Sequence, residues 1–86
     1  MKFKVLLHKR VYEFLKSLSL EDRHRLIDGI RDLEDFQKVR LDIVKIAGEK
    51  DTLRLRVGDY IVLFKVYERK KITVIVKIDI RRRVYR

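Results

Sequence analysis

The fold is decided by residues 53–64, which read Leu53-Arg54-Leu55-Arg56-Val57-Gly58-Asp59-Tyr60-Ile61-Val62-Leu63-Phe64. Apolar residues at 53, 55 and 57 alternate with two arginines, which is the period of a β-strand with one buried face. Gly58-Asp59 is typical of a tight hairpin turn. The run 61–64 is apolar at every position and is typical of a central strand covered by helices on at least one side. These residues therefore predict a β-hairpin inside a layered domain.

A last strand follows the hairpin. Residues 68–71 read as a charged turn, and residues 72–80 as a strand with a period of two. One set on this strand is Ile72, Val74, Val76, Ile78 and Ile80, and the alternating set is Thr73, Ile75, Lys77 and Asp79. We expect the two sets to lie on opposite faces of the sheet.

The N-terminal half reads as one strand and two helices. Residues 2–7 alternate as a first strand, and Val11, Leu15 and Leu18 recur with helical spacing. Ser19 precedes Asp22 by three residues, an approximate capping box that starts a second helix through 33. Gly29 inside this helix indicates close approach of the neighbouring helix. Residues 37–48 predict an extended connection with a short strand.

Together these elements predict an α+β fold of order β-α-α-β-β-β. The N-terminal strand and a helical hairpin pack on an antiparallel sheet, and residues 1–86 form a single domain.

The charge is concentrated on the sheet half of the chain. There are 23 Lys and Arg against 13 Asp and Glu, a net charge of +10, and residues 51–86 hold 11 of the basic but only 4 of the acidic side chains. A positive charge of this size favours binding to polyanions. Nucleic acid is the first candidate ligand, and an acidic protein is the alternative. No run is long enough for a membrane span and the start lacks a signal peptide, so we expect a soluble, cytoplasmic protein that contacts no membrane.

Chemistry that depends on metals, thiols or bound nucleotides has no support in the sequence. There is no Cys, and His8 and His24 fall on different elements without carboxylates at ligand spacing, so we expect surface or helix-end histidines and no cofactor. The remaining candidates for a functional site are basic side chains. Arg54 and Arg56 project from one face of a strand, and guanidinium groups bind phosphate bidentately. The alternative is a solvated edge strand with a basic tail.

The chain resembles the RelE/ParE superfamily of toxins from toxin–antitoxin pairs. The resemblance rests on Lys45-Ile46-Ala47-Gly48, on Leu53-Arg54-Leu55-Arg56-Val57-Gly58-Asp59-Tyr60 and on the ending Arg81-Arg82-Arg83-Val84-Tyr85. It covers essentially the whole chain and is closest to archaeal RelE-type members, whose first helix also follows a His-Lys pair, here His8-Lys9.

The resemblance implies a ribosome-dependent endoribonuclease that cuts mRNA in the decoding site. It acts without metal, by attack of the ribose 2′-OH on the adjacent phosphate. The catalytic residues that the resemblance implies are Arg54, Arg56, Arg81 and Tyr85. The three arginines, with Arg83 as the alternative to Arg81, are expected to hold the phosphate and offset the charge that develops on it. Tyr85 is expected to exchange protons or to stack on a base. Further cations are expected to bind RNA: Lys45, Lys65, Lys77, Arg82, Arg83 and Arg86. Arginine is a poor general base, so the resemblance does not identify which residue accepts the proton.

Two departures from the family pattern leave alternatives open. Ile61 stands where many members have a phosphate-binding Arg, and Ile80 where a His often precedes the final arginines. The alternatives are a ParE-type toxin that inhibits DNA gyrase and a RelE-like protein that binds RNA without cutting it. In either toxin class the expected partner is an acidic or amphipathic, RelB-like antitoxin that covers the basic groove and adds buried apolar area.

Overall fold

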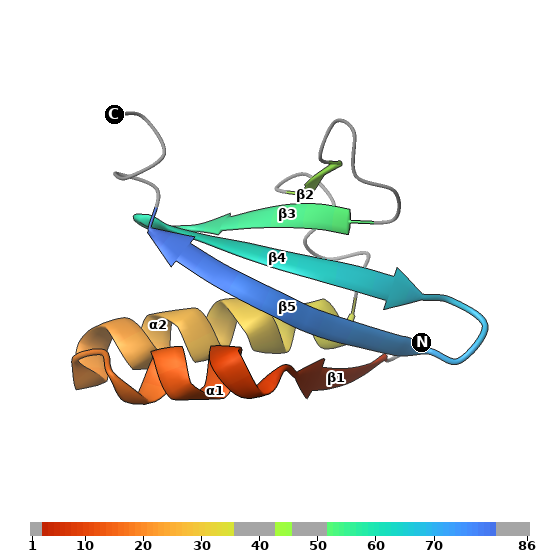
Figure 1. Ribbon diagram of the computed structural model, residues 1–86. Helices are drawn as coiled ribbons and strands as arrows, with labels where there is room; N and C mark the ends of the chain where they lie inside the picture. The colour runs from red at the N-terminus through yellow and green to blue at the C-terminus, as the bar shows by residue number, and fades with distance from the viewer. Residues whose placement is uncertain (1–2, 36–42, 46–51, 81–86) are drawn as a thin grey trace.

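The computed structural model describes residues 3–35, 43–45 and 52–80, and of residues 43–45 the backbone alone (Figure 1). In chain order the elements are β1 (Lys4–Leu7), α1 (Lys9–Lys16), α2 (Leu20–Arg31), the 3-10 helix η1 (Asp32–Glu34), β2 (Ile43–Lys45), β3 (Thr52–Val57), β4 (Tyr60–Tyr67) and β5 (Ile72–Ile80). The predicted α+β order is confirmed, and β2 is the short strand expected within residues 37–48. No helix in the described ranges is long and apolar enough to cross a bilayer.

The strands form one sheet in the order β1-β5-β4-β3-β2. Strands β2 to β5 pair antiparallel, as predicted. At the other edge β1 joins this antiparallel sheet and runs parallel to β5, with Lys4 opposite Ile72 and Leu7 opposite Ile75, so the complete sheet is mixed. Figure 1 shows β1 alongside β5 and both helices on one side of the sheet. We call the side that carries the helices the inner face and the other side the outer face.

A β-bulge changes which residues of β5 face the helices. Phe64 pairs with Ile75 but Leu63 pairs with Lys77, so Val76 is the extra residue. As a result Thr73 and Ile75 are fully buried on the inner face, and the predicted phase of this half of the strand is wrong. The Nε of Arg10, in the first turn of α1, donates to the Val76 carbonyl at 2.7 Å and satisfies an acceptor that the bulge removes from the regular ladder.

The helical hairpin has well-defined ends. The Ser19 hydroxyl accepts from the Asp22 backbone N–H at 3.2 Å, so the predicted N-cap of α2 is confirmed. Helix α1 ends at Lys16, before Leu18, which the helical spacing had included. Its last carbonyls are satisfied by the Arg23 guanidinium, which donates to the carbonyls of Leu15, Lys16 and Leu18 at 3.0 to 3.2 Å.

Gly29 lies on the side of α2 that faces β3. A Cβ atom at this position would lie 2.8 Å from Cγ2 of Val57, well inside normal contact distance. The predicted close approach is therefore real, but the neighbour is the sheet and not α1.

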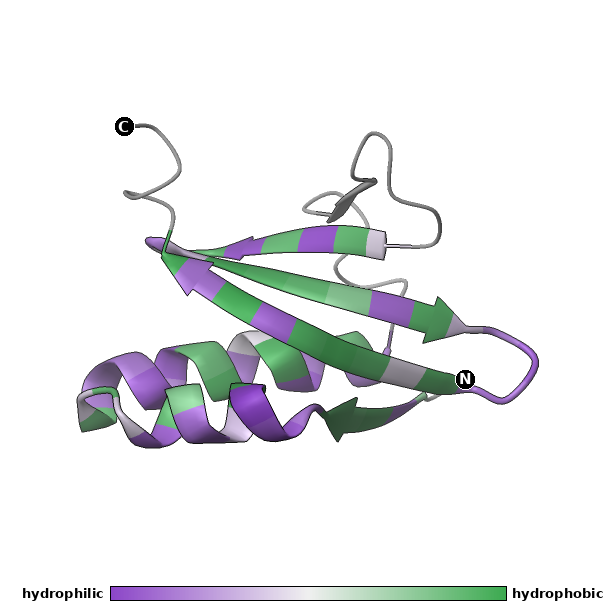
Figure 2. Ribbon diagram, in the orientation of Figure 1, coloured by the Kyte–Doolittle hydropathy of each residue, from purple (hydrophilic) through white to green (hydrophobic). Residues whose placement is uncertain are grey.

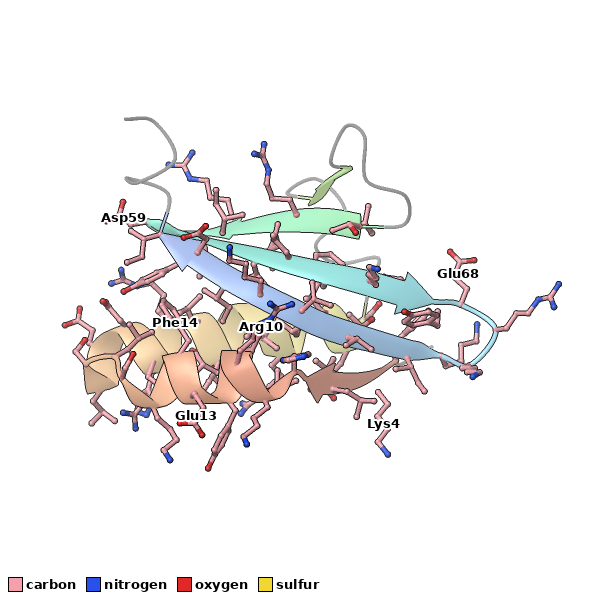
Figure 3. The ribbon with its side chains drawn as sticks, viewed as in Figure 1. Lys4, Arg10, Glu13, Phe14, Asp59 and Glu68 are labelled. Carbon is pink, nitrogen blue, oxygen red and sulfur yellow. The ribbon has the colours of Figure 1, made fainter. Side chains whose placement is uncertain are left out.

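The core fills the space between the helices and the inner face. Its largest fully buried side chains are Phe64, Leu26, Leu33, Ile75, Val11, Val62 and Thr73. Phe14 packs edge-on against Tyr60, with ring centroids 6.1 Å apart, and the Tyr60 hydroxyl donates to the Asp22 carboxylate at 2.8 Å. Figure 3 shows Phe14 pointing from α1 toward the sheet while Glu13 points away from it. The predicted cover of the central strand by the helices is confirmed, and the outer face has no element of the described chain packed on it (Figure 1).

Candidate functional site

Strand β3 presents two arginines on the outer face. Leu55 is buried and Leu53 and Val57 pack against the core, so the alternating Arg54 and Arg56 project from the other side, as the sequence predicted. Both are exposed, and neither has an ion-pair partner among residues 3–35 and 52–80. Figure 2 shows the alternation of hydrophilic and hydrophobic residues along β3 that produces this arrangement.

A tight turn at Gly58-Asp59 follows β3 directly after Arg56 and Val57. Gly58 has φ 59°, a conformation that glycine adopts without steric cost, and Val57 pairs with Tyr60 across the two-residue turn. The Arg56 Nε lies 3.4 Å from the Gly58 carbonyl, a long contact that leaves the guanidinium group available to a ligand. Asp59, at the tip of the same turn, is exposed at the end of the molecule opposite Glu68 (Figure 3).

The strand register places further side chains in rows across the outer face. Arg54 is opposite Leu63, which is opposite Lys77, and Arg56 is opposite Ile61, which is opposite Asp79. Directly paired residues in antiparallel strands share a face, with neighbouring strands roughly 4.8 Å apart. Cations on β3 and β5 therefore flank an apolar strip on β4.

Lys77 and Asp79 form an ion pair on β5. Their Nζ and Oδ2 atoms are 3.7 Å apart, and both side chains are about half exposed, at 52% and 39%. The other carboxylate oxygen of Asp79 accepts from the backbone N–H of Ile80 at 2.8 Å. Lys65 lies one row further from the Gly58 turn, opposite Thr52. Three predicted cations, Arg54, Arg56 and Lys77, are thus brought together around Ile61 and Leu63.

The other predicted residues lie outside the described ranges or on the edge strand β2. Arg81, Arg82, Arg83, Tyr85 and Arg86 follow β5 and lie outside the described residues. Lys45 is at the end of β2, where its backbone is opposite Leu53. Sequence reasoning assigned no role to Asp79, although its spacing of two from Lys77 was a signal that the two share a face.

This arrangement suits a phosphodiester better than a metal or a nucleophile. Guanidinium groups stay charged and donate two hydrogen bonds to phosphate oxygens, and the half-buried Leu63 beside them offers an apolar surface for sugar or base. Among the described residues no group of three or more His, Asp or Glu could hold a metal ion. His8 caps the start of α1 by accepting from the Arg10 N–H, so the expectation of a helix-end histidine is confirmed for it.

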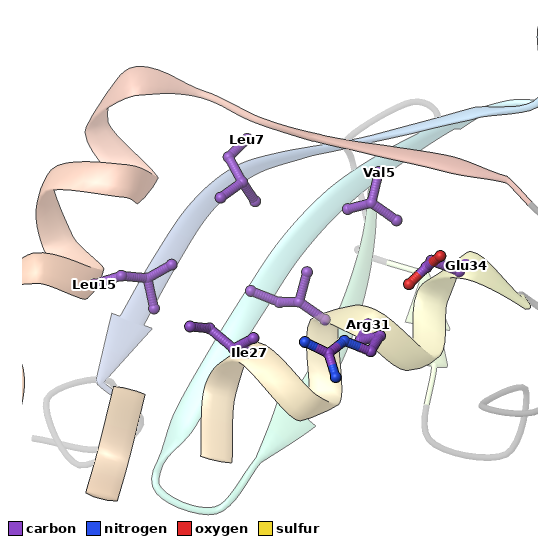
Figure 4. A pocket seen from close by; sticks show the side chains of 7 residues that line it. Val5, Leu7, Leu15, Ile27, Arg31 and Glu34 are labelled. Atoms are coloured by element: carbon purple, nitrogen blue, oxygen red, sulfur yellow. The ribbon is translucent and has the colours of Figure 1, made fainter. Parts of the chain in front are cut away.

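A separate apolar groove lies on the helix side of the molecule. It has a volume of about 200 Å³ and runs between β1, α1 and α2 (Figure 4). Its lining residues are Val5, Leu7, Leu15, Ile27, Ile30, Arg31 and Glu34. The two charged members have opposite signs and sit at the α2–η1 end, so the groove suits an apolar side chain with a mixed polar flank.

The chain is similar to known proteins along its whole length. No protein-family model matches it. A protein of Methanocaldococcus jannaschii named "Putative toxin RelE1" is 33% identical over 89 residues, which cover 100% of this chain and 98% of that protein. A chain in the crystal structure of the archaeal RelE-RelB complex from Pyrococcus horikoshii superposes with a TM-score of 0.77 and 31% identity, covering 94% of this chain and 97% of that one. In the RelB-RelE antitoxin-toxin complex from Methanococcus jannaschii the TM-score is 0.71 at 26% identity, with 93% and 94% covered.

Proposed function

Since the chain belongs to the RelE family and is a RelE-type toxin of a toxin–antitoxin system, we propose that it cleaves mRNA on the ribosome. The 2′-oxygen of one nucleotide attacks the adjacent phosphorus and the 5′-oxygen of the next nucleotide leaves. The products are a 2′,3′-cyclic phosphate and a 5′-hydroxyl.

The observation that carries this proposal is the arginine pair on β3. Arg54 and Arg56 are exposed, lack acidic partners in the described chain, and share the outer face with Lys77 across Leu63. Fixed cations of this kind stabilise the charge that develops on the phosphate oxygens as the 2′-oxygen attacks. We propose Arg81 and Tyr85, from the segment after β5, as further members of the site, with Lys45, Lys65, Arg82, Arg83 and Arg86 as RNA contacts.

The isoleucine at position 61 stands where the family pattern has an arginine. Ile61 is 7% exposed and lies in the row between Arg56 and Asp79, so it forms the floor of the proposed phosphate site and supplies no ligand to it. Arg54 and Arg56 therefore carry a larger share of phosphate binding in this chain.

The test is primer extension on ribosomes programmed with a defined mRNA. We expect the wild-type protein to generate new mRNA ends inside the decoding site. Arg54→Ala and Arg56→Ala should each slow cleavage by roughly 10²-fold or more, the usual effect of losing one preorganised charge-stabilising donor. Arg69→Ala is the matched control. Arg69 is an exposed arginine in the β4–β5 turn, which follows the last residue of β4, whereas Arg56 is opposite Ile61 at the start of β4.

The result that overturns the proposal is the absence of new ends with wild-type protein. Inhibited DNA supercoiling in its place would identify a ParE-type gyrase inhibitor. Salt-sensitive binding to many RNAs without cleavage would identify an RNA-binding protein.

We also propose an acidic or amphipathic RelB-like antitoxin as the partner. The structures of relatives described above are complexes with RelB. The net charge of +10, the apolar groove and the exposed Leu6 and Leu7 on edge strand β1 supply both kinds of surface that such a chain would cover. Co-expression with the product of an adjacent small reading frame should yield one complex on size exclusion, and separate elution would contradict this partner.

A further inference from the structure

Asp79 is the one acidic residue that the described strands place on the outer face. The other charged side chains there are basic: Lys4 on β1, Arg54 and Arg56 on β3, Lys65 on β4 and Lys77 on β5. A carboxylate in a phosphate-binding surface repels the ligand, so its presence weakens binding. Because Asp79 weakens phosphate binding, we looked for a function that a carboxylate can perform and a cation cannot.

Such a role exists in the chemistry. Attack by a ribose 2′-OH requires a group that removes its proton, and this group must hold a free lone pair at neutral pH. Guanidinium and ammonium groups are protonated there and donate hydrogen bonds only. A carboxylate is ionised and accepts. Of the charged groups on the described outer face, Asp79 alone has the chemistry of a proton acceptor.

The position of Asp79 fits this role. It lies in the row that contains Arg56 and Ile61, so its Cα is roughly 10 Å from that of Arg56, two strand spacings away. A phosphodiester above Ile61 can then meet a guanidinium group from β3 and a carboxylate from β5. Ile61 is buried, which provides an apolar floor under the reacting groups.

The carboxylate is also held in a fixed orientation. Oδ1 accepts the Ile80 backbone N–H at 2.8 Å, and Oδ2 lies 3.7 Å from Lys77 Nζ. The 3.7 Å separation is too long for a good hydrogen bond, so Oδ2 keeps its lone pairs for a ligand. Lys77 beside it can follow the phosphate oxygens when substrate enters.

We propose that Asp79 is the proton acceptor of the cleavage reaction, an inference that rests on the endoribonuclease function proposed above. Oδ2 takes the proton of the 2′-OH, and the 2′-oxygen forms its bond to phosphorus. The bond from phosphorus to the 5′-oxygen breaks, and that oxygen takes a proton from water. The products are the cyclic phosphate, the 5′-hydroxyl and a protonated Asp79, which returns its proton to solvent.

The experiment measures single-turnover cleavage on programmed ribosomes with saturating protein. Asp79→Asn keeps the size of the side chain and an oxygen for the Ile80 N–H, and should slow cleavage by about 10²-fold or more, the lower range for a lost general base. Its affinity for ribosomes should be no weaker than that of the wild type, because a negative charge has been removed. Asp59→Asn is the matched control, an exposed aspartate in the adjacent turn, and should cleave at nearly the rate of the wild type.

A second variant separates proton transfer from positioning. Asp79→Ala should be equally slow, and added formate should restore part of its rate in proportion to concentration, because a small carboxylate can enter the space left by the side chain. Thermal unfolding of each variant confirms that it is folded.

The outcomes distinguish this inference from the function on which it rests. If wild-type protein makes no new mRNA ends, the proposed function fails. If wild-type protein cleaves and Asp79→Asn cleaves at a similar rate, the role of Asp79 is refuted and the function stands. If both Asp79 variants are slow but formate has no effect, Asp79 positions Lys77 and is not the proton acceptor.

Discussion

Replacing Gly29 with alanine tests the contact between α2 and the strand that carries the arginines. In an exposed helix interior this substitution stabilises a protein by about 1 kcal/mol, because alanine has the higher helix propensity. Here the new Cβ would lie 2.8 Å from Cγ2 and 3.4 Å from Cγ1 of Val57. The end of a valine side chain is stiff, because two heavy atoms on Cβ restrict its rotation. The contact can be relieved only if the helix or β3 moves.

The net effect follows from two opposing terms. Overpacking of this kind costs about 1–3 kcal/mol, and the gain in helix propensity offsets about 1 kcal/mol of it. We therefore expect Gly29→Ala to lower the free energy of unfolding by about 1 kcal/mol, and to lower Tm by roughly 4–8 °C in a domain of this size. Denaturation by guanidinium chloride, followed by circular dichroism, measures the change.

A second background gives the decisive comparison. In Val57→Ala both γ-carbons are absent, so Gly29→Ala should there raise stability by about 1 kcal/mol. The change of sign between the two backgrounds is the signature of the contact, and it appears as a coupling energy in the double-mutant cycle. If Gly29→Ala stabilises both backgrounds equally, α2 does not pack on β3 at Val57, and the placement of the outer-face arginines loses its support.

Two further substitutions test how the helical hairpin is held. Tyr60→Phe removes the 2.8 Å hydrogen bond to the Asp22 carboxylate and should lower the free energy of unfolding by about 1–2 kcal/mol in urea denaturation, since bonds to charged groups are the stronger class; an unchanged midpoint would show that this bond contributes nothing. Ser19→Ala removes the N-cap of α2 and should cost about 1 kcal/mol, whereas Ser19→Gly should recover most of that loss; equal stability of the two variants would argue against capping by the hydroxyl.

Much of the fold and half of the candidate site follow from local patterns. The face of Arg54 and Arg56 is set by strict alternation with Leu53, Leu55 and Val57, and a pattern with one polar side has only one reading. The cap at Ser19 was equally readable, because it depends on residues three positions apart.

The sequence-based predictions are wrong or incomplete where the two faces of a strand do not differ in hydropathy, or where the residue in contact is far away in the chain. In β5 both alternating sets contain large apolar residues, so hydropathy could not locate the bulge at Val76 or identify Thr73 and Ile75 as the inward pair. The direction of β1 was not readable either, because periodicity reports the face of a strand and not its neighbour. Gly29 signalled a close approach without naming Val57 as the side chain approached.

Asp79 was missed for a related reason. Its significance depends on the row that it shares with Ile61 and Arg56, and that row is created by the pairing of three strands. The sequence shows Asp79 close to Lys77, but its place in a row with Arg56 appears only when the sheet is assembled.

The parallel pairing of β1 with β5 also governs when this toxin can exist as a folded molecule. Lys4 and Ile72 are neighbours in the sheet although 68 positions separate them in the chain, so β1 is synthesised long before the strand with which it pairs. At a synthesis rate of about 5–20 residues per second, the N-terminal strand waits roughly 3–14 s before residue 72 has been added. Contacts between such distant segments close slowly, because the entropy of a long loop must be lost first. The hairpin of β3 and β4, which carries the arginines, is synthesised earlier than β5, the strand on which α1 packs. During synthesis there is therefore an interval in which the toxin chain is present but its fold is not complete.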